Sequence, residues 1–184
     1  PHAVTVHSDL AEALDGVGFV QESAPEDLTL KRELFARIEA ALAPGVVVGS
    51  STSGYSMTEM STELNDPGRF VVGHPFNPPY LIPLVEVVGG EGSDADAVTW
   101  ASGWYEHIGK SVITMEREVP GFIANRLQEA MWREALHMVE NGEATVEQID
   151  LSITEGPGLR WPLQGPMLTF HLAGGPGGMA HMLD

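Results

Sequence analysis

The chain has 184 residues, about the length of one domain or slightly more, and 43% of them are hydrophobic, which excludes a disordered chain. The absence of cysteine excludes disulfides, thiolate metal sites and cysteine nucleophiles, and no other metal site is expected. The net charge of −17 argues against nucleic-acid and anionic-membrane partners, and neither a membrane span nor a signal peptide is evident. We therefore expect a soluble, cytoplasmic protein.

The first part of the chain alternates short apolar runs with amphipathic stretches. Strands are predicted at residues 3–6, 17–21, 46–48, 70–72, 84–88 and 111–115. Helices are predicted at 8–14, 25–42, 57–64 and 94–107, the first capped by Ser8 and the last by Ser93. Continuous apolar strands in this order indicate an α/β domain over residues 1–118, with a parallel sheet covered by helices on both faces.

After Pro120-Gly121 the pattern changes to helices alone. A long amphipathic stretch covers residues 122–140, and Asn141-Gly142 ends it. Thr145 and Gln148 have the spacing of a capping box, which predicts a second helix through residue 153, and a third is predicted at 165–173. The α/β unit is therefore followed by an all-α unit over residues 119–184.

Two segments that follow predicted strands carry polar side chains. Ser50–Gly54 comes directly after one strand, at the kind of position where α/β sheets bind ligands, although a helix cap and a turn would use the same residues. His74 ends the next strand, and Glu86 lies in the strand after that. A carboxylate bonded to one imidazole nitrogen leaves the other free to accept a proton, so the pair can act as a general base. The alternative is a structural histidine.

Two further segments lie in the predicted helical part. Asn125 and Arg126 are expected about one turn inside its first helix, near the change of domain, where clefts favour ligands. Arg160 and Trp161 lie in the link between two helices, where an arginine can hold a carboxylate and a tryptophan face can receive a cation. The alternatives are a solvated helix face for the first segment and a packing turn for the second.

Four motifs together resemble the L-3-hydroxyacyl-CoA dehydrogenase superfamily. They are Val20–Glu26 with Lys31, Ser50–Gly54, Gly73–Pro78 followed by Leu84–Val87, and Pro120–Leu127. Their order and spacing match across essentially the whole chain. The resemblance implies the C-terminal part of a Rossmann-like NAD-binding domain followed by an all-α substrate and dimerisation domain, and hence a homodimer. Because the sequence contains no GxGxxG, we expect a central fragment that lacks the N-terminal unit carrying this motif.

The resemblance also implies roles for individual residues. His74 would be the general base for the substrate hydroxyl, and Glu86 would orient it. Ser53 and Asn125 would complete the polar site around the reacting oxygen. The dinucleotide would be contacted by Glu26, Lys31, Ser53 and Asn77.

Within the superfamily, Gly156–Pro166 and Thr169–Gly175 most resemble the branch that oxidises the 3-hydroxyl of L-carnitine to 3-dehydrocarnitine with NAD. A substrate with a trimethylammonium group and a carboxylate would suit Trp161, Phe170 or Tyr80 for the cation and Arg126 or Arg160 for the carboxylate. L-3-Hydroxyacyl-CoA and L-gulonate remain alternative substrates. A non-catalytic structural relative of the crystallin kind, and a betaine-binding relative, remain alternatives of another class.

Overall fold

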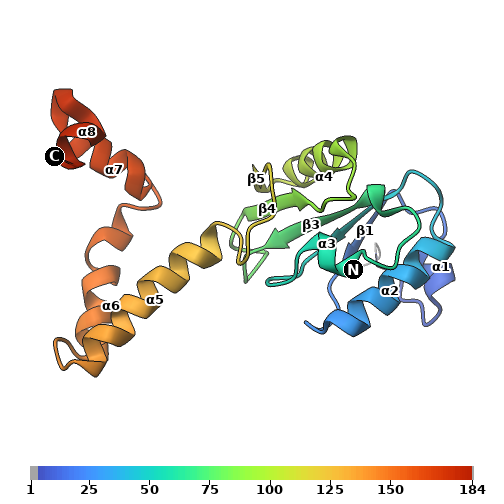
Figure 1. The fold of residues 1–184 in the computed structure, drawn as a ribbon, viewed down its shortest axis with the longest axis horizontal. Coiled ribbons are helices and arrows are strands. Elements are labelled where there is room, and N and C mark those ends of the chain that lie inside the picture. The colour runs from blue at the N-terminus through green and yellow to red at the C-terminus, as the bar shows by residue number, and fades with distance from the viewer. Residues whose placement is uncertain (1–3, 184) are drawn as a thin grey trace. The chain divides into compact units, whose positions relative to one another are not determined.

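The computed structural model describes residues 4–183, which form two compact units that divide after Arg126. The first unit is built on a five-stranded sheet in the order β1-β2-β3-β4-β5 (Figure 1). Its strands are β1 (Phe19–Glu22), β2 (Val47–Ser50), β3 (Phe70–Pro75), β4 (Leu84–Gly89) and β5 (Ser111–Thr114). The predicted α/β class is confirmed, and the predicted boundary between residues 118 and 119 stays a prediction.

The strand directions differ from the expected parallel sheet. β1, β2 and β3 are parallel, and β4 is parallel to β5, but β3 and β4 pair in antiparallel fashion. The reason lies in the connection between β3 and β4, which consists of residues 76–83. A parallel connection needs a crossover of about a dozen residues or more, which this loop cannot supply.

Helices cover both faces of the sheet, as predicted (Figure 1). One face packs against α1 (Leu10–Leu14), α2 (Leu28–Ala41) and α3 (Met57–Met60), and the other packs against α4 (Ala95–His107). Alternate strand residues supply the two cores. The α2 side buries Val48, Phe70, Val72 and Val88, and the α4 side buries Val47, Val71, Val85 and Val87.

Four local expectations are wrong. The described part of the predicted strand at 3–6 is irregular, because Val4 and Val6 are 80% and 90% exposed and pack against nothing that would hold a strand. The first helix is capped by Asp9 rather than Ser8. Ser93 does not cap α4, because its hydroxyl donates to Phe70 O of β3. The helix expected at 57–64 ends after Met60 in α3, and a turn follows it.

The second unit is helical, as predicted. α5 (Ala124–Glu140) enters it and is followed by α6 (Val146–Thr154), a 3-10 turn η2 (Pro157–Leu159), α7 (Pro166–Ala173) and α8 (Gly178–Leu183). The capping box of Thr145 and Gln148 opens α6, and α8 is an additional helix that the glycine-rich sequence before it did not indicate. Among the described residues, no helix has the length and apolarity needed to cross a membrane.

Candidate active site

His74 and Glu86 meet across the antiparallel strands β3 and β4. They are register partners, and His74 Nδ1 lies 3.0 Å from Glu86 Oε2. Both side chains are buried, with 3% and 0% of their surfaces exposed. Because a carboxylate only accepts, the neutral imidazole is assigned its proton on Nδ1, which leaves Nε2 as the nitrogen that can accept a proton. The sequence predicted that His74 and Glu86 could pair as a general base, and the reversal of β4 makes the two residues direct cross-strand neighbours.

The second oxygen of Glu86 holds the start of α5. Glu86 Oε1 accepts hydrogen bonds from Ile123 N at 2.9 Å and from Ala124 N at 3.0 Å. A carboxylate at a helix N-terminus satisfies amides that have no partner within the helix and complements the helix dipole. Glu86 therefore has two functions: it fixes the imidazole of His74, and it fixes the beginning of α5 against the sheet.

A strained turn places an aromatic ring beside the imidazole. Gly121 and Phe122 adopt positive φ values of 73° and 52°, and such a value is uncommon for a residue other than glycine. The turn puts the Phe122 ring 4.9 Å from the His74 ring, and Phe76 lies 5.1 Å away on the loop after β3. Local strain of this kind is maintained where the surroundings require it, and it is common at functional sites.

The loop Thr52–Gly54 follows β2 and is tied down by hydrogen bonds on both sides. Glu26 Oε1 accepts from Ser53 N at 3.1 Å, from Gly54 N at 3.0 Å and from the Thr52 hydroxyl. On the other side, Asn125 Nδ2 donates to Ser53 O at 3.2 Å. The structure thus brings together three of the predicted site residues, Glu26, Ser53 and Asn125.

The electrostatics of Glu26 follow from these contacts. Its partial burial acts to raise the pKa, but the hydrogen bonds from Thr52, Gly54 and Ser53 and the positive charge of Lys31 outweigh that effect and hold the pKa of Glu26 below its ordinary value. The other oxygen, Oε2, lies 3.5 Å from Lys31 Nζ, and the side chain is 42% exposed. Glu26 therefore presents a charged acceptor to solvent at the carboxyl end of the strands.

The side chain of Lys31 is buried. Its ammonium group donates to Glu22 and to Ala24 O, and only 1% of the side chain is exposed. Glu22 was not singled out from the sequence, since a single charged residue at the end of an apolar run is usually solvated. A possible signal was the spacing, because Glu22 ends β1 and Lys31 lies in the first turns of the helix that packs on the same edge.

The remaining predicted residues are exposed. Asn77 lies in the loop after β3, next to Phe76, and Arg126 lies in the first turn of α5 together with Asn125, closer to the helix start than expected. Arg160 and Trp161 belong to the helical unit, directly after η2, where both side chains are exposed. Their roles in binding stay predictions.

Comparison with known proteins agrees with this arrangement. The family model described as 3-hydroxyacyl-CoA dehydrogenase, NAD binding domain, matches residues 2–119. The family model described as 3-hydroxyacyl-CoA dehydrogenase, C-terminal domain, matches residues 121–184. Together the two models account for almost the whole chain.

Individual relatives are similar over nearly all of this chain. An L-carnitine dehydrogenase of Streptomyces coelicolor is 72% identical over 98% of the chain and 57% of its own length. The chain spans about half the length of the curated relatives it matches. One similar crystal structure is a 5-formyl-3-hydroxy-2-methylpyridine 4-carboxylic acid 5-dehydrogenase (TM-score 0.86, 32% identity, 90% of this chain and 53% of that one). Another is 3-hydroxybutyryl-CoA dehydrogenase from Escherichia coli (TM-score 0.77, 32% identity, 91% of this chain and 34% of that one).

Proposed function

Because the chain belongs to the 3-hydroxyacyl-CoA dehydrogenase family, we propose that it carries the general-base site of an NAD-dependent enzyme that oxidises the 3-hydroxyl of L-carnitine to 3-dehydrocarnitine. The observation that carries this proposal is the buried pair of His74 and Glu86, 3.0 Å apart. The choice of carnitine rests on the names of relatives such as the Streptomyces coelicolor protein.

The proton path begins at the substrate hydroxyl. His74 Nε2 accepts the hydroxyl proton, and the ring becomes a cation that the Glu86 carboxylate stabilises through Nδ1–H. The rings of Phe76 and Phe122 flank the imidazole and limit its contact with water. Ser53 and Asn125 position the reacting oxygen, and their own hydrogen bond keeps that part of the site in one conformation.

The residues at the carboxyl end of β1 and β2 fit a nicotinamide dinucleotide in part. The Glu26 carboxylate belongs to a side chain that is 42% exposed and is a charged acceptor of the kind that binds ribose hydroxyls, and Ser53 and Asn77 are exposed polar residues. The fourth expected contact, Lys31, fits poorly because its ammonium is buried against Glu22. A dinucleotide held by these residues would supply the acceptor for the hydride on C3 of the substrate.

The finer contacts with substrate are proposed on chemical grounds. Arg126 or Arg160 holds the carboxylate, since a guanidinium can bind it with two parallel hydrogen bonds. Trp161 receives the trimethylammonium group on its indole face. Trp161 is 38% exposed in the helical unit, so part of its surface is available to such a contact.

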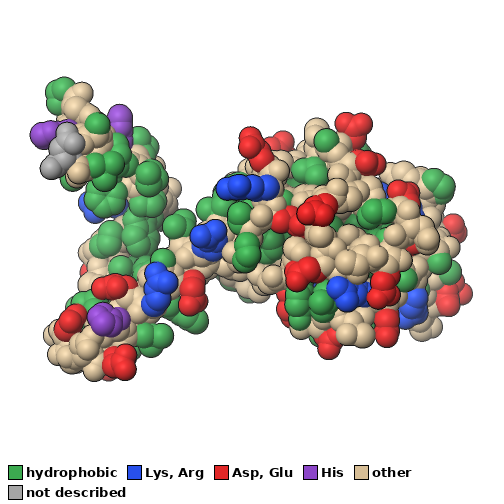
Figure 2. Space-filling model, viewed as in Figure 1, with side chains coloured by type: hydrophobic (Ala, Val, Ile, Leu, Met, Phe, Trp, Pro, Cys, Tyr) green, Lys and Arg blue, Asp and Glu red, His purple; other side chains and the backbone are tan. Residues whose placement is uncertain are grey.

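The helical unit is proposed to form a homodimer. Figure 2 shows hydrophobic side chains spread over the surface of this unit. On α5 and α6, Trp132, Leu136, Val146 and Leu151 are between 57% and 69% exposed. An apolar surface of this extent is typical of one that is covered in the assembled protein. Trp132→Glu is expected to shift the protein toward monomer in sedimentation velocity, and an unchanged sedimentation coefficient would contradict the proposal.

The proposed activity is tested on the protein expressed from its complete reading frame. NADH formation is followed with L-carnitine, L-gulonate and an L-3-hydroxyacyl-CoA side by side. We expect turnover of carnitine, and a His74→Gln variant that loses about 10²–10⁴-fold in kcat, the usual contribution of a general base. His107→Gln is the matched control, because His107 is exposed at the end of α4.

Other outcomes would contradict parts of the proposal. A clear preference for the coenzyme A ester or for gulonate would keep the base and overturn the choice of substrate. Full activity of His74→Gln would remove His74 from its role. Binding of carnitine that is independent of NAD and of His74, without turnover, would favour the betaine-binding alternative.

A further inference from the structure

A chain of charged side chains connects the end of β1 to the loop after β2. It starts at Glu22, which is 3% exposed and accepts from Lys31 Nζ at 2.9 Å and 3.1 Å with its two carboxylate oxygens. The Ser50 hydroxyl donates to the same carboxylate at 2.5 Å. Glu22 is therefore fully partnered below the surface and does not face a ligand.

Lys31 is the next member and also lacks a free donor. An ammonium group has three N–H donors. The Lys31 ammonium donates to both Glu22 oxygens and to Ala24 O 3.2 Å away, and it lies 3.5 Å from Glu26 Oε2 as an ion pair. Because the side chain is 1% exposed and every donor has a protein acceptor, Lys31 acts on Glu26 rather than on a bound molecule.

Glu26, held by Lys31, in turn holds the backbone of Ser53. Its Oε1 accepts from the amides of Ser53 and Gly54, while Asn125 Nδ2 holds Ser53 O from the other side. Ser53 is thus fixed on both sides, by a carboxylate at its N–H and by an amide at its C=O. Neither contact uses the Ser53 hydroxyl, which is left for a ligand.

We propose that Glu22 and Lys31 are positioning residues that hold the Glu26 carboxylate against Thr52–Gly54 and so fix Ser53 opposite Asn125. The proposal rests on the proposed function in one respect, the use of Ser53 by cofactor and substrate. It assigns Lys31 an indirect role where the family resemblance implied a direct contact with the dinucleotide. It also gives Glu26 two roles, one through each oxygen.

A purely stabilising role would be a weak reason for this pair. The desolvation of two buried charges offsets most of their attraction, so replacing both with uncharged groups of similar size is often close to neutral for stability. Removing only Lys31 would leave Glu22 buried and unpaired, which is strongly destabilising. The informative variant is therefore the double replacement Glu22→Gln/Lys31→Met, which removes the ion pair between these residues and the charge that acts on Glu26 without leaving a buried charge.

The first measurement is hydrogen–deuterium exchange on the ligand-free protein expressed from its complete reading frame. We expect the amides of residues 53 and 54 to exchange at least about tenfold faster in Glu22→Gln/Lys31→Met and in Glu26→Ala, which corresponds to the loss of a hydrogen bond to a charged group. The matched control is Glu33→Gln/Arg37→Met, which removes one charge of each sign from exposed positions of the same helix. The control should exchange like the wild type.

The second measurement is steady-state turnover at saturating NAD. If Glu26 only contacted the dinucleotide, saturation would restore the rate of Glu26→Ala. Positioning predicts that kcat/KM for the hydroxy substrate stays about tenfold lower or worse, in this variant and in the double variant. Thermal unfolding of each variant, with a midpoint near that of the wild type, separates this effect from loss of the fold.

Unchanged exchange at residues 53 and 54 in the double variant, or full recovery of Glu26→Ala by NAD, would overturn the proposal. If the double variant fails to fold, Glu22→Gln alone decides, because glutamine removes the charge that holds the Lys31 ammonium and replaces one of its two acceptor oxygens with an amino group that only donates. Wild-type exchange at residues 53 and 54 in that variant would overturn the proposal. Failure of the wild type to oxidise carnitine would overturn the proposed function alone, since the exchange experiment uses no substrate.

Discussion

Replacing Glu86 by glutamine tests the central pair with the smallest change of shape. The carboxylate has two sets of partners: Oε2 faces His74 Nδ1, and Oε1 accepts from the amides of Ile123 and Ala124. A glutamine keeps the volume but has one acceptor oxygen and one amino group that only donates. Its orientation in the variant therefore decides which tautomer His74 adopts.

The structure indicates which orientation is favoured. If the amino group faced Ile123 N and Ala124 N, two part-buried amides would lose their acceptor, at about 1 kcal/mol each, the lower end of the range because water can partly reach them. The total of about 2 kcal/mol favours the opposite orientation by a factor of about 30. In that orientation the amino group donates to His74 Nδ1, the ring proton moves to Nε2, and Nε2 can no longer accept the substrate proton.

We expect Glu86→Gln to lose about 10²–10⁴-fold in kcat, the contribution of a general base. Its unfolding temperature should change by only about 2–4 °C, since the backbone amides at the start of α5 keep their acceptor. The assay is NADH formation at saturating substrate and NAD, together with thermal unfolding. Glu106→Gln, at an exposed position of α4, is the matched control. A Glu86→Gln enzyme with kcat close to that of the wild type would refute the assignment of His74 and Glu86 as base and orienting carboxylate.

Two further predictions concern stability. A Cβ at Gly73 would lie 2.5 Å from Tyr105 Cζ, so Gly73→Ala should lower the free energy of unfolding in urea by about 1–3 kcal/mol. Gly103 lies in an open position of α4, so Gly103→Ala should raise it by about 0.5–1 kcal/mol. Equal stability of the two variants would contradict the close packing at Gly73. Slight burial acts to raise the pKa of Glu39, but the amide N–H groups of Asp66 and Asn65 lower it below its ordinary value. The carboxylate therefore stabilises the fold above its unfolded pKa, and this contribution is lost as pH falls through the lower folded pKa. The deficit of Glu39→Gln relative to wild type should thus shrink below about pH 4, and a deficit independent of pH would contradict the linkage.

Hydrophobic spacing was sufficient to locate most of the elements. The helix at Leu28–Ala41 and the strands at Phe70–Pro75 and Leu84–Gly89 are long enough, or apolar enough, for their pattern to decide the assignment. Strand direction could not be deduced in the same way, because a buried strand has the same apolar sequence pattern in a parallel and in an antiparallel sheet. The deciding signal was the short link at residues 76–83, which is a matter of length rather than of residue type.

The errors have physical causes as well. The apolar residues Val4 and Val6 satisfy a strand pattern, but a strand needs a partner, and none of the described strands pairs with them. Glu22 was missed because its burial depends on Lys31, nine residues away on another element. The helix Gly178–Leu183 follows a run of glycines that disfavours helix, so propensity alone gave no indication of it.

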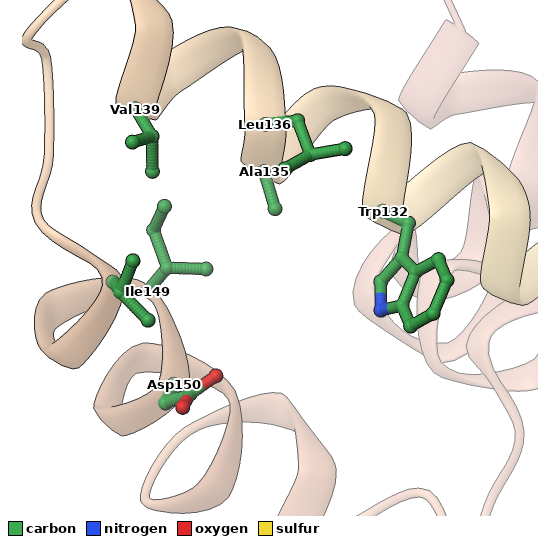
Figure 3. Close-up of a pocket in the computed structure, with 7 residues that line it drawn as sticks. Trp132, Ala135, Leu136, Val139, Ile149 and Asp150 are labelled. Atoms are coloured by element: carbon green, nitrogen blue, oxygen red, sulfur yellow. The ribbon is translucent and has the colours of Figure 1, made fainter.

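The helical unit shows a different limit of sequence reasoning. α5 and α6 enclose an apolar hollow of about 280 Å³, lined by Trp132, Ala135, Leu136, Val139, Val146, Ile149 and Asp150 (Figure 3). The sequence predicted an amphipathic helix over residues 122–140, where the structure has α5. Periodicity carries no information on what packs against its apolar face, because a core within one chain and an interface between two copies have the same pattern.

Two carboxylates in the α/β unit, those of Glu86 and Glu26, hold pairs of backbone amides in the same way. Glu86 uses one oxygen for a pair of backbone amides and the other for His74; Glu26 uses one oxygen for a pair of backbone amides and the other for Lys31. In each case two successive backbone amides are held by a carboxylate from a different segment of the unit. Asn125 then joins the two held segments through Ser53 O. A loop can present side chains with the accuracy that catalysis needs only if its backbone amides have fixed acceptors, and these two carboxylates supply them.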